Sequence, residues 1–217
     1  MFSKVGRDFL AKPIALLAAR LHSLGVTPNG LTYTGFALTL LTAVFLARGQ
    51  FVVGALMLIV ASLFDMLDGA VARLTKQIST FGAFIDSTLD RYSESVTFLA
   101  LAFHYSRAAA TRTELILVFV IIVGSLMVSY TRARAEGLQL QSKSGLLQRP
   151  ERIVLLIFGL LSGWMQPVLW LMAILTNLSA VQRIYEVYWQ TSAAVGAANP
   201  ADAVPADPSA DEQPTPR

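Results

Sequence analysis

Long apolar segments separated by short polar breaks dominate the first 190 residues of the chain. Runs long enough for helices follow one another at about 31–47, 51–74, 81–105, 114–134, 150–161 and 167–189. A helix needs about 20 apolar residues to cross the hydrocarbon core of a bilayer, and most of these runs approach that length. The pattern therefore predicts an all-α integral membrane protein, with six transmembrane helices forming one domain over residues 25–190.

The two ends of the chain differ from this middle part. In residues 1–24 apolar side chains recur near helical spacing among the basic residues Lys4, Arg7, Lys12 and Arg20. This predicts an amphipathic helix on the membrane surface, with an ordinary solvated helix as the alternative. Residues 191–217 are rich in Ala, Pro and Asp and contain no Leu, Ile, Met or aromatic residue, which predicts a disordered tail.

The composition supports the membrane assignment. Of the 217 residues 54% are hydrophobic and only 14% are charged, well below the roughly 25% charged residues of soluble domains. The chain has no cysteine, which excludes disulfides and thiolate metal sites. No feature of the sequence points to a nucleic-acid partner.

Basic residues are distributed unequally between the two sets of loops. Four Lys or Arg precede the first apolar run, two follow the second and five lie between the fourth and fifth, whereas the opposite loops hold only Arg48, Arg107 and Arg112. Cytoplasmic loops carry the excess of Lys and Arg. We therefore expect a multi-pass protein of the cell (inner) membrane with cytosolic termini.

Four aspartates stand where the second and third apolar runs meet. Asp65 and Asp68 are three residues apart, and Asp86 and Asp90 are four apart, so each pair shares one helical face. Charged side chains in a spanning helix are costly and need partners. The short polar turn over residues 74–80 would let the two acidic faces meet in a helical hairpin, on the cytosolic side.

Carboxylate oxygens are ligands for Mg²⁺, Mn²⁺ or Ca²⁺, and clustered carboxylates need cations to stay ionised. We expect two ions, Mg²⁺ or Mn²⁺, because two-metal sites suit phosphoryl chemistry. Small residues at Gly69, Ala72 and Gly82 leave room for a bulky ligand, and Arg73 can reach a phosphate. The alternatives are acids that only pair with neighbouring basic residues, or the cation pathway of a transporter.

A second group of charges lies at the same ends of the later runs. Arg132, Arg134, Arg152 and Arg183 have forked guanidinium groups that suit phosphate oxygens. They indicate a second substrate that carries a phosphate. Contacts with anionic lipids are the alternative.

The spacing D-x-x-D-G-x-x-A-R-x8-G-x-x-x-D-x-x-x-D, from Asp65 to Asp90, resembles the signature of the CDP-alcohol phosphotransferases (CDP-alcohol phosphatidyltransferases). The segments FGAFIDSTLDR, SYTRARAEG, RPER and VQR are most similar to the bacterial phosphatidylinositol phosphate synthase branch of that family. One departure is Arg132, where that branch has Lys. The resemblance covers roughly residues 25–189.

The resemblance implies a homodimeric membrane transferase for phospholipid head groups. It would transfer the phosphatidyl group of CDP-diacylglycerol to inositol 1-phosphate, giving phosphatidylinositol phosphate and CMP. The nearest alternative keeps the chemistry with glycerol 3-phosphate as acceptor, and an alternative of another class is a cation-coupled transporter.

The resemblance also implies roles for individual residues. Asp65, Asp68 and Asp86 would hold one metal ion, Asp65, Asp86 and Asp90 the other, and Asp90 would be the catalytic base. The expected contacts to the CDP-lipid are Pro28, Asn29, Gly30, Leu31, Gly69, Ala72, Arg73, Ser79 and Gly82. Those to the acceptor phosphate are Ser129, Arg132, Arg134, Arg152 and Arg183.

Overall fold

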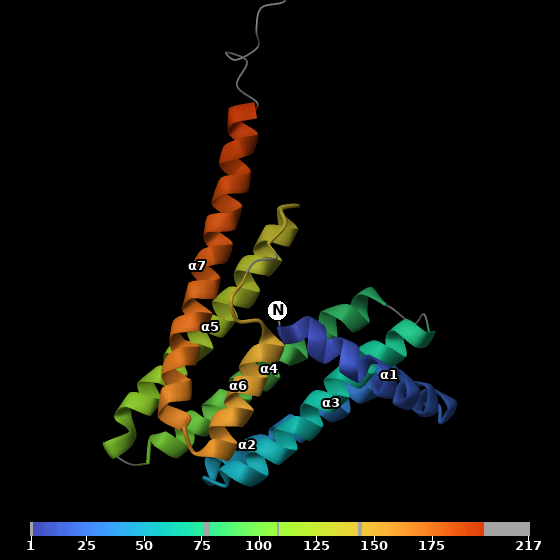
Figure 1. Ribbon diagram of the computed structural model, residues 1–217, viewed down its shortest axis with the longest axis vertical. Helices are drawn as coiled ribbons and strands as arrows, with labels where there is room; N and C mark the ends of the chain where they lie inside the picture. Colours follow the sequence, from blue (N-terminus) through green and yellow to red (C-terminus); the bar gives the residue numbers. More distant parts are fainter. Residues whose placement is uncertain (1, 76–78, 108, 143–144, 198–217) are drawn as a thin grey trace, which may run out of the picture.

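A computed structural model describes residues 2–75, 79–107, 109–142 and 145–197 of the chain. Their helices are α1 (Phe2–Ser23), α2 (Pro28–Ala47), α3 (Phe51–Thr75), α4 (Thr80–Tyr105), the 3₁₀ turn η1 (Ala109–Thr111), α5 (Arg112–Gly137), α6 (Arg149–Ser162) and α7 (Met165–Ala197) (Figure 1). The described residues contain no strand. The predicted all-α class is therefore confirmed.

The helix boundaries follow from residues that begin or end helices. Thr27 caps α2, with its side chain accepting a hydrogen bond from the Gly30 backbone N–H, and Pro28 is the first helical residue. Ser79 caps α4 in the same way through the Gly82 N–H. Gly163 ends α6 in the left-handed region at φ 75°.

Among the described residues, four helices are long and apolar enough to cross a membrane: α2, α3, α5 and α7 up to Ser192. Helix α4 is long, but Asp86, Asp90, Arg91 and Glu94 interrupt its apolar sequence. Helix α6 has only 14 residues, about 21 Å at 1.5 Å per residue. The structure thus describes a helical protein with four candidate membrane spans, and the six crossings that the sequence predicts stay a prediction.

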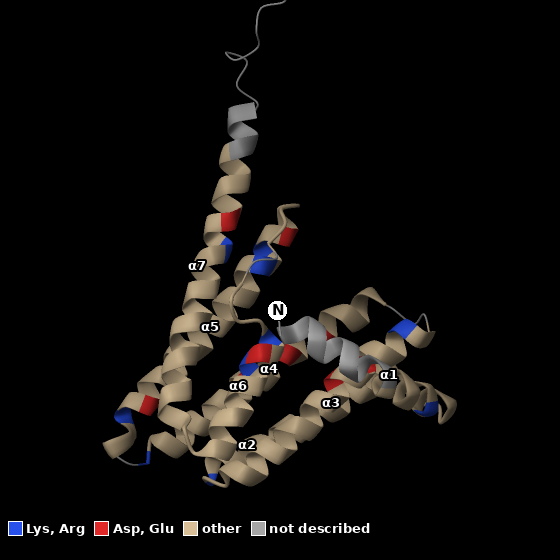
Figure 2. Ribbon diagram, in the orientation of Figure 1, with Lys and Arg blue, Asp and Glu red and all other residues tan. Residues whose placement is uncertain are grey.

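Apolar side chains nevertheless cover the outside of all six helices from α2 to α7. Phe103 of α4 is 58% exposed and Val154 of α6 is 67% exposed, as exposed as Phe119 of α5 at 51%. Soluble proteins rarely expose contiguous apolar surface on this scale. Figure 2 shows long stretches of helix without Lys, Arg, Asp or Glu, for example along α2 and the lower part of α7. This surface suits contact with acyl chains.

The interior of the bundle is a single apolar cluster built from several helices. Leu46, Leu58, Phe98, Ile121 and Met172 are almost fully buried within it. Helices α5 and α7 lie side by side, as do α2 and α3 (Figure 1). At Gly124 of α5 a Cβ atom would stand 2.7 Å from Thr176 Oγ1 of α7, so only glycine permits this close approach of the two helices.

Helix α1 packs across α3 (Figure 1). Ala18 is fully buried, and together with Ile14 and Leu21 it packs in a second apolar cluster that includes Leu67 and Val71. Leu16 and Leu17 are exposed. One apolar face thus docks α1 on the bundle. The side chains of Lys4, Arg7 and Lys12, on which the predicted membrane-surface contact depends, lie outside the described side chains.

Helix α7 is longer than predicted. It continues to Ala197, whereas the sequence places the start of the disordered tail at residue 191. Alanine has the highest intrinsic helix propensity, and the segment 191–197 contains three alanines, which accounts for the extension. Residues 198–217 of the predicted tail lie outside the described residues.

Candidate active site

An open cavity with an empty volume of about 600 Å³ lies where α2, α3 and α4 meet. Its lining consists of Pro28, Asn29, Thr32, Asp68, Gly69, Ala72, Arg73, Ser79, Gly82, Ala83 and Asp86. The structure thus brings together seven of the residues expected to contact a CDP-lipid. The other two differ: Leu31 is buried in the cluster beneath α1, and the Gly30 N–H is bonded to the Thr27 side chain.

Two helix N-termini open into this cavity. Pro28 and Asn29 begin α2, and Ser79 and Gly82 belong to the first turn of α4. The N-terminal end of a helix carries partial positive charge and suits an anion, and the exposed Arg73 adds a full charge. A Cβ on Gly82 would lie 2.8 Å from Ser79 Oγ and 3.3 Å from Asn29 Oδ1. Any larger residue at position 82 would therefore have to displace the Ser79 cap and crowd Asn29 in this cavity.

Asp68 and Asp86 bring negative charge to the same cavity. Asp68 is 5% exposed, and its Oδ2 accepts a hydrogen bond of 2.7 Å from Thr32 Oγ1. This bond fixes the direction of the carboxylate. Sequence reasoning did not identify Thr32 as a site residue, although its position one helical turn after Pro28 places it on the cavity face of α2.

Asp65 and Asp90 are joined through Arg149, the first residue of α6. The Arg149 guanidinium contacts Asp65 Oδ2 and Asp90 Oδ1, each at 2.7 Å, through two different nitrogens. All three side chains are about one fifth to one quarter exposed. The sequence singled out Arg149 only as one of several basic loop residues. The following Pro150 marks a helix start, and this was the only sequence feature that set Arg149 apart from the other basic loop residues.

The four aspartates match the donor chemistry of a hard divalent cation but are not gathered around one point. Within the described residues no group of three acidic, His or Cys side chains is close enough to hold an ion. Arg149 lies between Asp65 and Asp90, and Asp68 is bonded to Thr32. Helices α3 and α4 both pack on α2 rather than chiefly on each other, so the two acidic faces do not meet in the close helical hairpin that the sequence predicts. The four carboxylates are nevertheless the all-oxygen donor set that Mg²⁺ and Mn²⁺ prefer.

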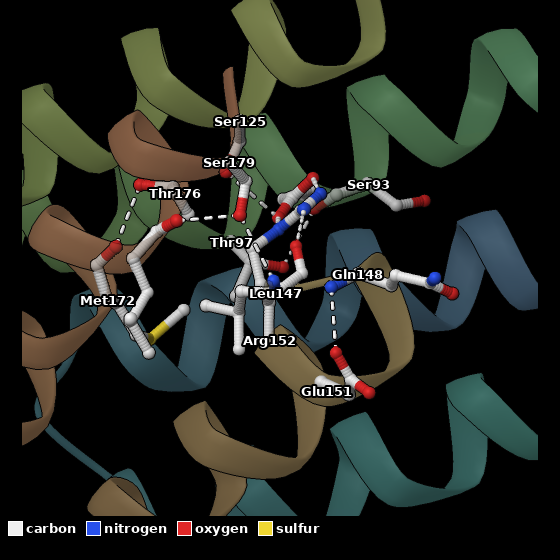
Figure 3. Close-up of polar contacts among 12 residues, drawn as sticks. Ser93, Thr97, Ser125, Leu147, Gln148, Glu151, Arg152, Met172, Thr176 and Ser179 are labelled. Atoms are coloured by element: carbon white, nitrogen blue, oxygen red, sulfur yellow. Dashed lines mark hydrogen bonds and ion pairs between the residues drawn. The ribbon is translucent and has the colours of Figure 1, made fainter. Parts of the chain in front are cut away.

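The Arg152 side chain is buried and makes its contacts inside the protein. It is 3% exposed, and its guanidinium binds both carboxylate oxygens of Glu94, at 2.6 and 2.8 Å. It also donates to the Leu147 carbonyl, and Ser125 donates to Glu94. Figure 3 shows Arg152 close to Leu147, with Ser125 and Ser179 nearby. Glu94 thus has a defined partner that its sequence position alone did not reveal.

The other residues predicted for the acceptor phosphate are only partly brought together. Arg183 is 6% exposed, donates to the Val128 carbonyl at 2.6 Å and lies within electrostatic range of Arg132 and Arg152. Arg132 is exposed and pairs with Glu136 at 2.8 Å. Arg134 is exposed and, two residues further along α5, lies on a different face from Arg132. Ser129 is half-buried on the same helix.

The start of α6 is held in place by several backbone contacts. Gln148 and Glu151 form a capping box (Figure 3). The Leu147 N–H donates to Ser179 Oγ of α7 at 3.0 Å. A second cavity, with about 420 Å³ of empty volume, is lined by Asp65, Glu94, Arg149 and Arg152 among others. The capped helix start therefore places both arginines beside the acidic residues of α3 and α4.

Comparison with known proteins agrees with this geometry. The model of the CDP-alcohol phosphatidyltransferase family matches residues 25–184. An archaetidylinositol phosphate synthase of Pyrococcus horikoshii is 37% identical over 188 residues, which cover 86% of this chain and 96% of the relative. A phosphatidylinositol phosphate synthase of Mycobacteroides abscessus is 30% identical over 195 residues, covering 86% and 89%.

Solved structures are similar as well. The phosphatidylinositol phosphate synthase of Mycobacterium tuberculosis with CDP-DAG bound superposes with a TM-score of 0.75 at 30% identity, covering 81% of this chain and 93% of that one. A structure of the same enzyme with manganese and citrate gives a TM-score of 0.76, covering 81% and 88%. The family model matches residues 25–184, which are most of this chain. The chain therefore belongs to the CDP-alcohol phosphatidyltransferase family.

Proposed function

We propose that this protein transfers the phosphatidyl group of CDP-diacylglycerol to inositol 1-phosphate, releasing phosphatidylinositol phosphate and CMP. The observation that carries the proposal is the cavity in which two helix N-termini, Arg73, Asp68 and Asp86 meet in a chain of this family. The archaeal and mycobacterial relatives differ in the lipid part of their names but share the inositol phosphate part. This shared part favours inositol phosphate as the acceptor.

The donor's diphosphate suits the positive end of the cavity. Backbone N–H groups at the starts of α2 and α4 can donate to phosphate oxygens, and Arg73 can pair with them. Gly69, Ala72 and Gly82 leave the space that a nucleotide needs against the helix backbones. The lipid tails would remain outside the bundle, against the exposed apolar faces of the helices.

Two divalent ions, Mg²⁺ or Mn²⁺, belong to the proposal. Asp65, Asp68 and Asp86 would hold one ion, and Asp65, Asp86 and Asp90 the other. Bound ions would neutralise the diphosphate and the charge that develops on the leaving CMP. Thr32 keeps Asp68 oriented for this role through its hydrogen bond of 2.7 Å.

The reaction itself is a displacement at phosphorus. A hydroxyl oxygen of the inositol ring forms a bond to the phosphorus that carries diacylglycerol, and the bond from that phosphorus to the oxygen of CMP breaks. Asp90 takes the proton of the attacking hydroxyl as general base. In the ligand-free chain Asp90 pairs with Arg149 at 2.7 Å, and Asp90 would be free to accept the proton once that pair has opened.

The acceptor phosphate would lie near the arginines of α5, α6 and α7. Arg132, Arg152 and Arg183 concentrate positive charge there, while Ser129 and Arg134 stand on the same part of α5. Since Glu94 already accepts hydrogen bonds from two guanidinium nitrogens of Arg152, Arg152 would contribute to phosphate binding mainly by its position and charge. Arg132, where related synthases have Lys, would offer a forked contact in place of a point charge.

The membrane arrangement completes the proposal. Six crossings by α2 to α7, with the termini and aspartates cytosolic, are supported by the apolar outer surfaces of α4 and α6 and by the positive-inside distribution of Lys and Arg. In this arrangement α1 would lie along the cytosolic membrane surface. The family resemblance further implies a homodimer.

The direct test is an acceptor assay. The purified chain, in detergent or nanodiscs with Mg²⁺ or Mn²⁺ and CDP-diacylglycerol, is offered inositol 1-phosphate, free inositol or glycerol 3-phosphate, and CMP is quantified together with the lipid product. We expect CMP and phosphatidylinositol phosphate only with inositol 1-phosphate.

Each alternative makes a different prediction in the same experiment. CMP release with glycerol 3-phosphate in place of inositol 1-phosphate would transfer the proposal to phosphatidylglycerophosphate synthesis. Cation flux into proteoliposomes without CMP release from any acceptor would instead support the cation-coupled transporter.

A further inference from the structure

Arg149 occupies the place between two of the four aspartates. One terminal nitrogen of its guanidinium lies 2.7 Å from Asp65 Oδ2 on α3, and the other lies 2.7 Å from Asp90 Oδ1 on α4. A planar fork of this kind matches two carboxylates far better than an ammonium group does. Arg149 thus ties together two of the carboxylates that the proposed function assigns to divalent ions.

This position is set by the backbone of α6. Gln148 and Glu151 cap the helix at the adjoining residues. Leu147 is bonded to Ser179 of α7, and Arg152, one turn on, is held by Glu94 of α4. The Cα of Arg149 is therefore fixed beside Asp65 of α3 and Asp90 of α4, while its long side chain can still change direction.

The guanidinium is only partly satisfied where it lies. Arg149 Nε is buried and has no hydrogen-bond partner among the described residues. A buried donor without a partner is costly. Breaking the two contacts with Asp65 and Asp90 costs free energy. Part of this cost is recovered if the guanidinium moves to a position where Nε also has a hydrogen-bond acceptor.

We propose that Arg149 is an internal cation that holds Asp65 and Asp90 in the absence of divalent ions, and must release them before those ions bind. The inference rests on the proposed function, since it takes these aspartates as metal ligands. Arg149 keeps the carboxylates close together despite their like charge and competes with divalent ions for Asp65 Oδ2 and Asp90 Oδ1. It therefore sets the affinity of the site for cations.

The test measures Mn²⁺ binding, not turnover. Free Mn²⁺ is followed by electron paramagnetic resonance as it is titrated into the full chain in detergent, without substrates. Arg149→Gln removes the positive charge but keeps a side chain of polar character. We expect this variant to bind Mn²⁺ at least about tenfold more tightly than the original chain, since removing one adjacent charge changes such an interaction by a kcal/mol or more.

Two further variants separate competition from other effects. Arg48→Gln removes the same charge at the far end of α2, about 30 Å from Pro28 by the helix rise, and should leave the affinity unchanged. Arg149→Lys keeps the charge, but a single ammonium cannot bridge both carboxylates, so it should bind Mn²⁺ more tightly than the original chain and less tightly than Arg149→Gln. If Arg149→Gln does not fold, the Mn²⁺ affinity of Arg149→Lys alone tests the inference.

The outcomes are distinct. Mn²⁺ affinity that is unchanged or weaker in a folded Arg149→Gln or Arg149→Lys chain overturns the inference. If the original chain binds Mn²⁺ and releases CMP but the variants bind no more tightly, only this inference fails. If the original chain neither binds Mn²⁺ nor releases CMP, the proposed function fails with it.

Discussion

At the scale of single residues, the orientation of the acids depends on neighbours that carry no charge. Asp68 is buried and accepts a hydrogen bond of 2.7 Å from the Thr32 hydroxyl, while Gly82 leaves space beside Ser79 and Asn29. These contacts decide where a carboxylate points and how closely a phosphate can approach the helix ends. The aspartate spacing alone provides neither.

Thr32→Val tests the first of these contacts. Val has the same shape but cannot donate a hydrogen bond, so Asp68 loses its oriented partner, a loss of about 1.5–3 kcal/mol for a bond to a charged group. We expect weaker Mn²⁺ binding and a higher KM for CDP-diacylglycerol. Mn²⁺ titration and donor-dependent CMP release measure both.

Thr42→Val is the matched control for this change. Thr42 is equally buried on α2, but its hydroxyl bonds only the Leu38 carbonyl of its own helix. It should leave Mn²⁺ binding and the KM unchanged. If both variants lower Mn²⁺ affinity to the same degree, the Thr32 hydroxyl has no special role at Asp68.

At the scale of elements, the positions of the helices follow closely from the sequence, but the contacts between them do not. Pro28, Ser79 and Pro150 mark helix starts that local chemistry dictates, and the structure places α2, α4 and α6 there. The contact of Arg149 with Asp65 spans 84 residues. Periodicity along one helix cannot show which residue of a distant helix will lie opposite it.

The Glu94 and Arg152 pair shows the same limit and carries a prediction about stability. Glu94 and Arg152 are 11% and 3% exposed, so Glu94→Gln leaves a buried guanidinium without its counter-charge. Removing one partner of a buried pair costs about 3–5 kcal/mol. We therefore expect Glu94→Gln to lower the free energy of unfolding by this amount, measured in detergent by chemical denaturation.

An exposed pair provides the control. Glu136→Gln breaks the pair with Arg132, whose side chains are 56% and 54% exposed, and exposed pairs contribute less than about 1 kcal/mol. The two variants change charge in the same way. Equal destabilisation by both would contradict the view that Arg152 anchors α6 through Glu94.

At the scale of the whole molecule, the distribution of charge and apolar surface predicts how the chain lies in a membrane. Residue pattern alone located every helix from α2 to α7 within a few positions, except the C-terminal end of α7, which lies at Ala197 and not at the predicted 189. The agreement follows because burial in lipid demands long apolar segments. The pattern could not decide whether α4 and α6 cross, since α4 carries charged residues for the site and α6 is short. The proposed function would account for the charged residues that interrupt the apolar pattern of α4.

The absence of cysteine makes the topology directly measurable. Single substitutions Arg107→Cys, between α4 and α5, and Leu138→Cys, just after α5, place one thiol at each end of α5. In oriented vesicles, a membrane-impermeant maleimide should label residue 107 only from outside the cell and residue 138 only from the cytosolic side. Labelling of both thiols from the same side would show that α5 does not cross.

The central claim is that the acidic faces of α3 and α4 gather divalent ions around a nucleotide diphosphate. The most direct measurement is anomalous X-ray scattering at the manganese edge from crystals of the chain grown with Mn²⁺ and a CDP-lipid. The account predicts manganese within bonding distance of Asp65, Asp68, Asp86 and Asp90, next to the diphosphate, with Arg149 released from Asp65 and Asp90. Manganese bound elsewhere, with these four carboxylates free of metal and the diphosphate outside the cavity, would contradict it.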